Sequence, residues 1–277
     1  MKRTTLAKYL LATSLAFGTI GVSADAPDEL DPAALAAMAE EYATLSAPYL
    51  GGALPDSADF SPPAPQPGDA VQARDDAASE DGLALMGTPR WLLASEDASL
   101  RKGALSRAFS CATGIRIDDA GTPALSRLMS RAATDLAFST SDVKHLYQRP
   151  RPFMVNGKQT CTPEAEQVLR MDGSYPSGHS ALGYGVSLIL AELLPERAAQ
   201  IVSRGREFGE SRRICNVHWK SDVEEGRQIA AATVARLHSN ADFMSDIAAA
   251  KAEIASGLPA PDASGCAAEQ AALAMGR

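Results

Sequence analysis

One short stretch constrains this chain more than any other, because it places a proline, a hydroxyl, a glycine and a histidine where a long helix begins. The stretch runs from Gly173 to Ser180 and reads GSYPSGHS. Apolar residues then recur at helical spacing, at Leu182, Val186, Ile189, Leu190 and Leu193. A stripe with this period predicts a helix that is anchored in a core along one face.

The start of this helix has the features of an anion site. Ser177 is a typical N-cap residue, and an N-cap leaves the first backbone amides, those of Gly178 and His179, without intrahelical partners. Free amides at the positive end of a helix dipole favour an anion, and glycine allows it to come close. His179 adds a group that can donate or accept a proton. The plainer alternative is an ordinary N-cap followed by a surface histidine.

Helix signals continue through most of the chain after Asp69, with breaks near Gly87 and Gly114, and no segment shows the two-residue period of a strand. Thr122-Pro123, Thr162-Pro163 and Pro195 each mark a helix start, and the first of these helices is expected to run toward Tyr147. Ser221 and Glu224 have the spacing of a capping box. The pattern predicts an all-α fold, a compact multi-helix bundle.

The two ends of the chain read differently from its middle. Residues 1–24 resemble a signal peptide, with early cations, an apolar run too short for a membrane span, and small residues before Ala24. We expect cleavage near Ala24 and export, most simply to a bacterial periplasm. Residues 25–68 are expected to hold a short helix, opened by Asp31-Pro32, and a Pro/Gly-rich wrapping segment. Residues 69–257 would form the helical domain, and 258–277 a loose tail.

Charge and cysteine content exclude several classes of partner. The net charge of −8 argues against nucleic acid or an anionic membrane as a partner. The four cysteines lack any C-x-x-C pair, which argues against a zinc site. An even number of cysteines in an exported chain favours disulfides, and four allow three pairings. Among these we favour Cys111–Cys161 with Cys215–Cys266.

Three segments rich in basic residues and histidine lie next to predicted helix ends. The first holds Lys144 and Arg151-Pro152, the second is the Pro176–His179 stretch, and the third holds Ser211-Arg212, His218 and Asp222. Singly, each has an ordinary interpretation: solvated charges, cations at a helix C-terminus, or a core histidine bonded to an aspartate.

In this order, the three segments resemble the three-part signature of the PAP2 phosphatase superfamily. The string from Gly173 to His179 is similar to the class A bacterial non-specific acid phosphatases, as are the surroundings of Cys111, Cys161 and Cys215. The resemblance covers roughly residues 60–257. It departs from the family pattern at Ser180, where threonine is common, and at Pro150, and it does not reach Cys266.

The resemblance implies a secreted, metal-independent acid phosphatase without a cofactor. It implies His218 as a nucleophile that forms a phosphohistidine, with Asp222 orienting its ring, and His179 as the general acid and base. The phosphate would be held by Lys144, Arg151, Ser177, Gly178 and Arg212. Guanidinium and ammonium groups suit a phosphate dianion on physical grounds as well.

The expected partners are small phosphate monoesters, with phosphate transfer to alcohols as a side activity, and the resemblance implies a homo-oligomer, a dimer or larger. The preferred ester is not predicted. The alternatives are a vanadate-dependent haloperoxidase on the same scaffold, a non-catalytic periplasmic phosphate-binding protein and, disfavoured by the absence of a second long apolar run, a membrane lipid phosphatase.

Overall fold

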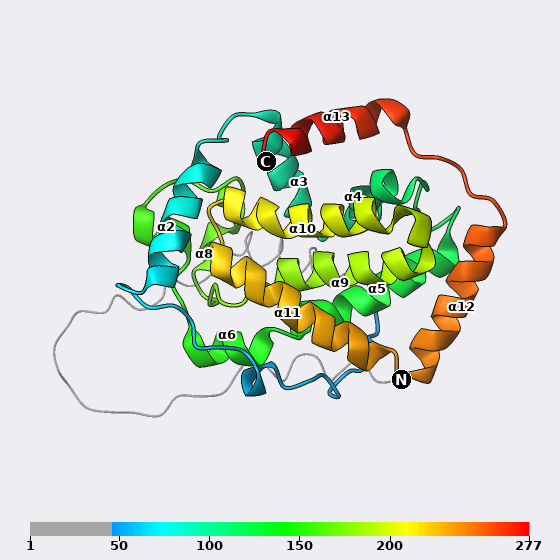
Figure 1. Ribbon diagram of the computed structural model, residues 1–277, viewed down its shortest axis with the longest axis horizontal. Coiled ribbons are helices and arrows are strands. Elements are labelled where there is room, and N and C mark those ends of the chain that lie inside the picture. Colours follow the sequence, from blue (N-terminus) through cyan, green and yellow to red (C-terminus); the bar gives the residue numbers. More distant parts are fainter. Residues whose placement is uncertain (1–45, 277) are drawn as a thin grey trace. The chain divides into compact units, whose positions relative to one another are not determined.

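The computed structural model describes residues 46–276, and within them it holds helices and no strands, which confirms the predicted all-α, multi-helix fold (Figure 1). The α-helices of this part are α2 (Ala70–Leu83), α3 (Pro89–Asp97), α4 (Ala104–Thr113), α5 (Pro123–Phe138), α6 (Ser141–Tyr147), α7 (Pro152–Asn156), α8 (Glu166–Leu169), α9 (Gly178–Leu193), α10 (Ala198–Ile214), α11 (Lys220–Leu237), α12 (Ala241–Ala255) and α13 (Ala263–Ala274). Three 3-10 turns, at Ser57–Asp59, Pro163–Ala165 and Pro195–Arg197, complete the set.

Helix α9 is the central element, packed between α10, α11 and α5 (Figure 1). The five apolar residues of its predicted stripe are all buried. Glycine allows one of these contacts to be very close: a Cβ on Gly226 of α11 would lie 2.4 Å from the carbonyl oxygen of Ser177. The start of α9 is therefore held against α11, backbone against backbone.

Two helix boundaries differ from the predictions, and both differences position polar groups. The helix that begins at Pro123 ends at Phe138, and α6 carries the chain on to Tyr147 in a new direction. Ser139 ends α5 by donating its hydroxyl to the carbonyl of Leu136 at 2.7 Å. The predicted run of a single helix to Tyr147 is thus wrong, because a local side-chain bond competes with helix continuation.

The predicted capping box of Ser221 and Glu224 is also wrong. Helix α11 begins earlier, with Trp219 as N-cap residue, and the carboxylate that reaches back is Asp222, which accepts from the Trp219 amide at 2.8 Å. Ser221 instead bonds to buried Asp75 of α2, through its amide at 2.8 Å and through its hydroxyl. A tertiary contact therefore overrides the local capping pattern.

The predicted signal peptide and the helix expected after Asp31 lie outside the described residues. The Pro/Gly-rich segment is irregular apart from its single 3-10 turn, as predicted. Its start is fixed by Asp135 of α5, whose carboxylate accepts from the amides of Tyr49 and Leu50 at 2.8 and 3.1 Å. Further on, the carbonyl of Pro62 accepts from the Tyr175 hydroxyl at 2.9 Å, so this segment contacts the signature stretch directly.

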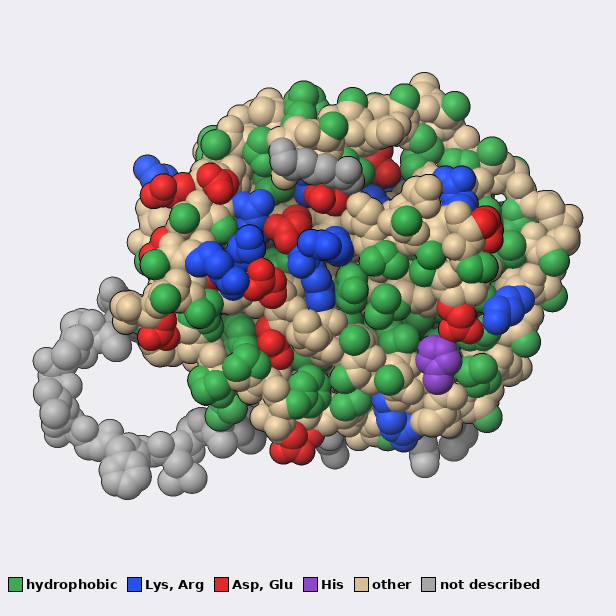
Figure 2. Space-filling model, in the orientation of Figure 1, with side chains coloured by type: hydrophobic (Ala, Val, Ile, Leu, Met, Phe, Trp, Pro, Cys, Tyr) green, Lys and Arg blue, Asp and Glu red, His purple; other side chains and the backbone are tan. Residues whose placement is uncertain are grey.

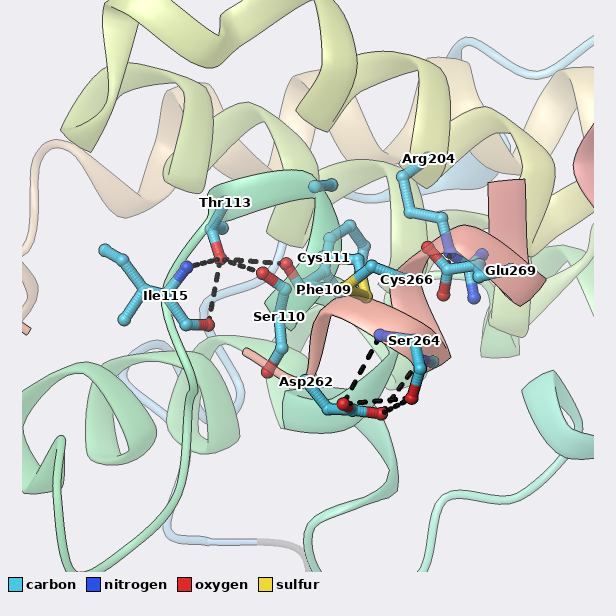
Figure 3. The surroundings of a disulfide bond; sticks show 12 residues. Phe109, Ser110, Cys111, Thr113, Ile115, Arg204, Asp262, Ser264, Cys266 and Glu269 are labelled. Carbon is cyan, nitrogen blue, oxygen red and sulfur yellow. Dashed lines mark hydrogen bonds and ion pairs between the residues drawn. A yellow bond between two sulfur atoms is a disulfide. The ribbon is translucent and has the colours of Figure 1, made fainter. Parts of the chain in front are cut away.

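The C-terminal residues correct two further expectations. They are not a loose tail, because residues 263–274 form α13, which Asp262 caps through the amides of Ser264 and Gly265. The disulfides join Cys111 to Cys266 and Cys161 to Cys215, with Cα–Cα distances of 5.3 and 4.8 Å, so the pairing favoured from the sequence is wrong. Figure 3 shows α13 fixed at Cys111 on one side, with its Glu269 beside Arg204 of α10 on the other, at 3.4 Å.

Candidate functional site

His218 lies at the centre of the candidate site, in the loop between α10 and α11, and its ring is buried. Its Nδ1 is 3.3 Å from Oδ2 of Asp222, and its Nε2 is 3.1 Å from Nη1 of Arg151. A guanidinium can only donate, so Nε2 accepts this bond with its lone pair. The proton of the neutral ring is then on Nδ1, where it is donated to the carboxylate of Asp222.

Asp222 is fully buried and is held from several directions. Besides the Trp219 amide, its Oδ1 accepts from Arg149 Nη1 at 2.6 Å. The other guanidinium nitrogen of Arg149 donates to Asp75 of α2 at 2.7 Å and to Gln72 at 2.6 Å. A network of buried charges therefore fixes the carboxylate that orients His218.

Sequence reasoning missed Arg149 and Asp75. The only signal for Arg149 is its place two residues before Arg151, in a loop already singled out for its cations. Asp75 carries no local signal, because it lies in an ordinary polar helix far away in the sequence and becomes important only through burial.

Two of the predicted phosphate-binding cations, Lys144 of α6 and Arg151 at the start of α7, lie beside His218 and are both buried. Lys144 Nζ donates to the carbonyl of Gly173 at 2.5 Å. Arg151 donates to the carbonyls of Leu169 and Val217 at 2.8 and 3.0 Å. Backbone carbonyls from the end of α8 and from two loops thus set the direction of both cations. Each cation also donates to Oδ2 of Asp172, at 3.1 Å in both cases.

The start of α9 lies against this group. Ser177 is the N-cap residue, and its hydroxyl accepts from the amide of Ser180 at 3.2 Å. Its own amide donates to the carbonyl of Asp222 at 2.9 Å, which ties the first turn of α9 to that of α11. Gly178 packs closely against α5, where a Cβ would come within 3.3 Å of the carbonyl oxygen of Ala137.

Arg212 lies in the last turn of α10 and is buried. The residue before it, Ser211, donates to Asp97 at 2.6 Å, and Asp97 is in turn paired with Arg204, so this turn is anchored. The charge of Arg212 lowers the pKa of both His179 and His218. All the sequence-predicted site residues therefore contribute to one connected region.

His179 follows Gly178 in α9, and its Nε2 lies 3.0 Å from the carbonyl oxygen of Ala98. A carbonyl can only accept, so Nε2 carries a proton and Nδ1 is the nitrogen that gains or loses one. The ring is also stacked with Phe208, with centroids 6.3 Å apart. Both partners fix its orientation.

Burial and neighbouring cations decide the ionisation of the site. Burial first, and then Arg151, Lys144 and Arg212, hold the pKa of His218 well below its usual range, which favours a neutral ring. Burial and Arg212 lower the pKa of His179 in the same way. Burial and Arg151 lower the pKa of Lys144 to about 8.

The pKa of Asp222 shifts in the opposite direction, upward. Burial raises its pKa, and Arg149 is the largest influence that lowers it again. A dianion that enters between these groups would favour the protonated forms of both histidines. Before an anion enters, the burial and the cations that lower the pKa of His218 favour an unprotonated imidazole nitrogen.

Two further histidines and a tryptophan have other surroundings. Trp219 is buried and donates Nε1 to the carbonyl of Pro150 at 2.8 Å, which is a packing role. His238 is the C-cap residue of α11 and pairs with Glu192 at 2.8 Å, as expected of a capping or surface residue. His145 is exposed on α6. The hydrogen bonds of Trp219 and His238 go to these other groups, whereas Asp222 and Arg151 bond to the ring of His218.

Tyr184 lines a separate cavity of about 330 Å³ with Arg206, Glu224 and Arg227. Figure 2 shows basic and acidic side chains gathered on the face that carries α2, α10 and α11. The charges there alternate in pairs, such as Arg74 with Glu224 at 2.6 Å and Arg213 with Glu210 at 2.9 Å. Because its charges are balanced, this cluster is unlike the group around His218.

Two further observations concern residues 46–276. No group of three or more His, Cys, Asp or Glu side chains in this part is arranged to hold a metal ion. None of its helices combines the length and the apolar character that crossing a bilayer requires.

Comparison with known proteins identifies the family of the chain. The sequence pattern of the PAP2 superfamily matches residues 124–244, which include every predicted site residue. An acid phosphatase of Zymomonas mobilis is 40% identical over 192 residues, 69% of this chain and 73% of its own length. Non-specific acid phosphatases of Salmonella typhimurium and Providencia stuartii are each 39% identical, over 70% and 72% of this chain and 78% and 81% of theirs.

The chain is a helical bundle with a histidine–aspartate pair inside a buried cluster of cations. Together with the matching sequence pattern, these features assign it to the PAP2 superfamily. Within that superfamily, the chain belongs to the family of the bacterial non-specific acid phosphatases.

Proposed function

We propose that this protein is an exported acid phosphatase that hydrolyses phosphate monoesters through a phosphohistidine at His218. The observation that carries the proposal is the state of the His218 ring. Its Nε2 lone pair accepts from Arg151 at 3.1 Å, and its Nδ1 proton is directed to buried Asp222. A neutral imidazole that is oriented by a carboxylate is an activated nucleophile, and the neighbouring Arg151 is one of the cations that would hold the phosphate.

In the first step, the Nε2 lone pair of His218 forms a bond to phosphorus as the bond from phosphorus to the ester oxygen breaks. The ring becomes cationic, and Asp222 stabilises it through the Nδ1 proton. The leaving alkoxide takes a proton from His179, whose Nε2 is already committed to Ala98, so the transferred proton comes from Nδ1.

In the second step, neutral His179 accepts a proton from water at Nδ1, and the water oxygen attacks phosphorus. The N–P bond breaks, its electron pair returns to Nε2 of His218, and inorganic phosphate leaves. An alcohol in place of water gives a new phosphate ester by the same step, and this is the basis of the proposed phosphotransferase activity.

The charge of the transferred group would be held by Lys144, Arg151 and Arg212, with the Ser177 hydroxyl and the Gly178 amide at the start of α9. This set of donors supplies the positive charge that a metal ion supplies elsewhere. We propose on this basis that the reaction needs no metal.

Export is proposed from the leader-like residues 1–24 and is consistent with two disulfides among the described residues. The substrates would be small monoesters with a terminal phosphate dianion. A homo-oligomer, a dimer or larger, is part of the same proposal.

The test is hydrolysis of para-nitrophenyl phosphate near pH 5.5 with excess EDTA, for the wild type and for His218→Ala. The proposal expects EDTA-resistant turnover that the substitution abolishes and orthovanadate inhibits. Turnover that EDTA removes would contradict the metal-independent mechanism. A wild type that binds phosphate without turnover would be a binding protein, and vanadate-dependent oxidation of halide by peroxide would make it a haloperoxidase.

A further inference from the structure

The carboxylate of Asp172 occupies the donors that a phosphate dianion would use. Its Oδ2 accepts from Lys144 Nζ and from Arg151 Nη2, at 3.1 Å in each case. These are two of the three cations assigned to phosphate binding. A substrate oxygen that approaches them meets an acceptor that already belongs to the chain.

Asp172 differs from the other carboxylates near His218 in its exposure. Its side chain is 46% exposed, whereas those of Asp75 and Asp222 are at 0%. An exposed carboxylate can rotate into water at little cost in solvation, while a buried one cannot. Asp172 is therefore able to leave the cations when another anion replaces it.

The cations do not depend on Asp172 alone for their positions. Lys144 keeps its bond to the carbonyl of Gly173 at 2.5 Å. Arg151 keeps its bonds to the carbonyls of Leu169 and Val217, and also to the backbone carbonyl of Asp172 at 3.1 Å. Rotation of the Asp172 side chain leaves all of these backbone bonds in place, so the phosphate site persists without the carboxylate.

We infer that Asp172 is a built-in competitor of phosphate, and that its carboxylate weakens the binding of substrate and product by holding Lys144 and Arg151 until an incoming dianion displaces it. The inference rests on the proposed function, since it concerns the same cations. It identifies Asp172 as a residue that sets affinity rather than as a catalytic residue. Its physical benefit is faster release of inorganic phosphate, because the carboxylate re-forms its ion pairs as the product leaves.

The experiment compares Asp172→Asn with the wild type in calorimetric titrations of inorganic phosphate at pH 5.5, on the full chain. Asparagine keeps the size and the backbone bonds but lacks the charge. Ion pairs with a partly exposed member are weak, so we expect the phosphate Kd to fall by about threefold to tenfold. The KM for para-nitrophenyl phosphate should fall with it, while kcat stays the same or declines as product release slows.

The matched control is Asp118→Asn. Asp118 is 41% exposed and is paired with Arg116 at 3.2 Å, and its replacement changes the net charge by the same amount outside the site. Its phosphate Kd should equal that of the wild type. Should Asp172→Asn fold poorly, Asp172→Ser tests the same loss of charge with a smaller side chain.

An unchanged or weaker phosphate affinity in folded Asp172→Asn would overturn the inference, and a weaker one would show that Asp172 only positions the cations. In that event, wild-type turnover that depends on His218 would leave the proposed function intact. A wild type that neither binds inorganic phosphate nor hydrolyses para-nitrophenyl phosphate would instead refute both the inference and the proposed function.

Discussion

Replacing Arg149 by methionine removes the cation that holds Asp222 and leaves a side chain of similar length. The Arg149 side chain is 4% exposed, and it pairs with Asp222 at 2.6 Å and with Asp75 at 2.7 Å, both at 0% exposure. Breaking a buried ion pair by removing one partner costs about 3–5 kcal/mol. For a domain of this size, that loss lowers Tm by about 6–20 °C, which differential scanning calorimetry measures.

The same substitution should change the pH dependence of turnover. Arg149 is the main influence that lowers the pKa of Asp222 against burial, so the pKa rises further without it. Asp222 must be ionised to stabilise the His218 imidazolium, and activity is lost as pH falls through the pKa of this carboxyl. The acid limb of kcat for Arg149→Met should therefore move to higher pH.

Arg204→Met separates the two effects. Arg204 is 2% exposed and paired with buried Asp97 at 2.5 Å, but its second carboxylate partner is Glu269 of α13 rather than Asp222. This variant should lose comparable stability and keep the wild-type acid limb. A folded Arg149→Met enzyme with wild-type Tm and an unshifted acid limb would refute the reasoning.

Two further predictions concern a cation and the disulfides. Burial lowers the pKa of Lys144 to about 8, so this residue loses its charge, and kcat/KM should fall, as pH rises through that value. Lys144→Arg should extend activity to higher pH. A wild-type profile of kcat/KM that still rises at pH 9 would contradict this prediction. Replacing Cys111 and Cys266 by serine should lower the free energy of unfolding by about 2–5 kcal/mol, because the bond spans 155 residues, with little effect on kcat. Urea denaturation measures the loss, and an unchanged midpoint would contradict the prediction that this disulfide stabilises the fold.

The helices could be predicted from the sequence because their signals are local. The stripe that begins at Leu182, the N-cap at Ser177 and the prolines at 123 and 195 each act within one or two turns. The errors came where a distant residue decides the outcome. Ser221 has the local pattern of an N-cap, but Asp75 engages its amide and hydroxyl.

The disulfide pairing and the C-terminal helix were beyond local reasoning for the same reason. Cys111 pairs with a residue 155 positions away rather than with Cys161, and only the packing of α13 near α4 and α10 brings them together. No period or spacing in the sequence encodes that proximity.

The site could be predicted in part. The signature named the residues that converge on His218, and the structure brings them into one region. Their catalytic roles remain predictions. Arg149 and Asp172 were missed because a charged residue in a sequence carries no sign of whether it will be buried in a network or will compete for a binding site.

The central claim is a covalent phosphate on His218, and the most direct measurement is mass spectrometry of the enzyme quenched in alkali during turnover of para-nitrophenyl phosphate. The His179→Ala variant suits this measurement best. Formation of the phosphohistidine should continue in it, because an aryl leaving group needs little help from an acid. Hydrolysis of the phosphohistidine should slow, because the attacking water has lost its general base. The account predicts one added phosphate, located on His218, that accumulates in His179→Ala and is absent in His218→Ala. Rapid turnover with no phosphate on His218, or turnover that survives in His218→Ala, would contradict it.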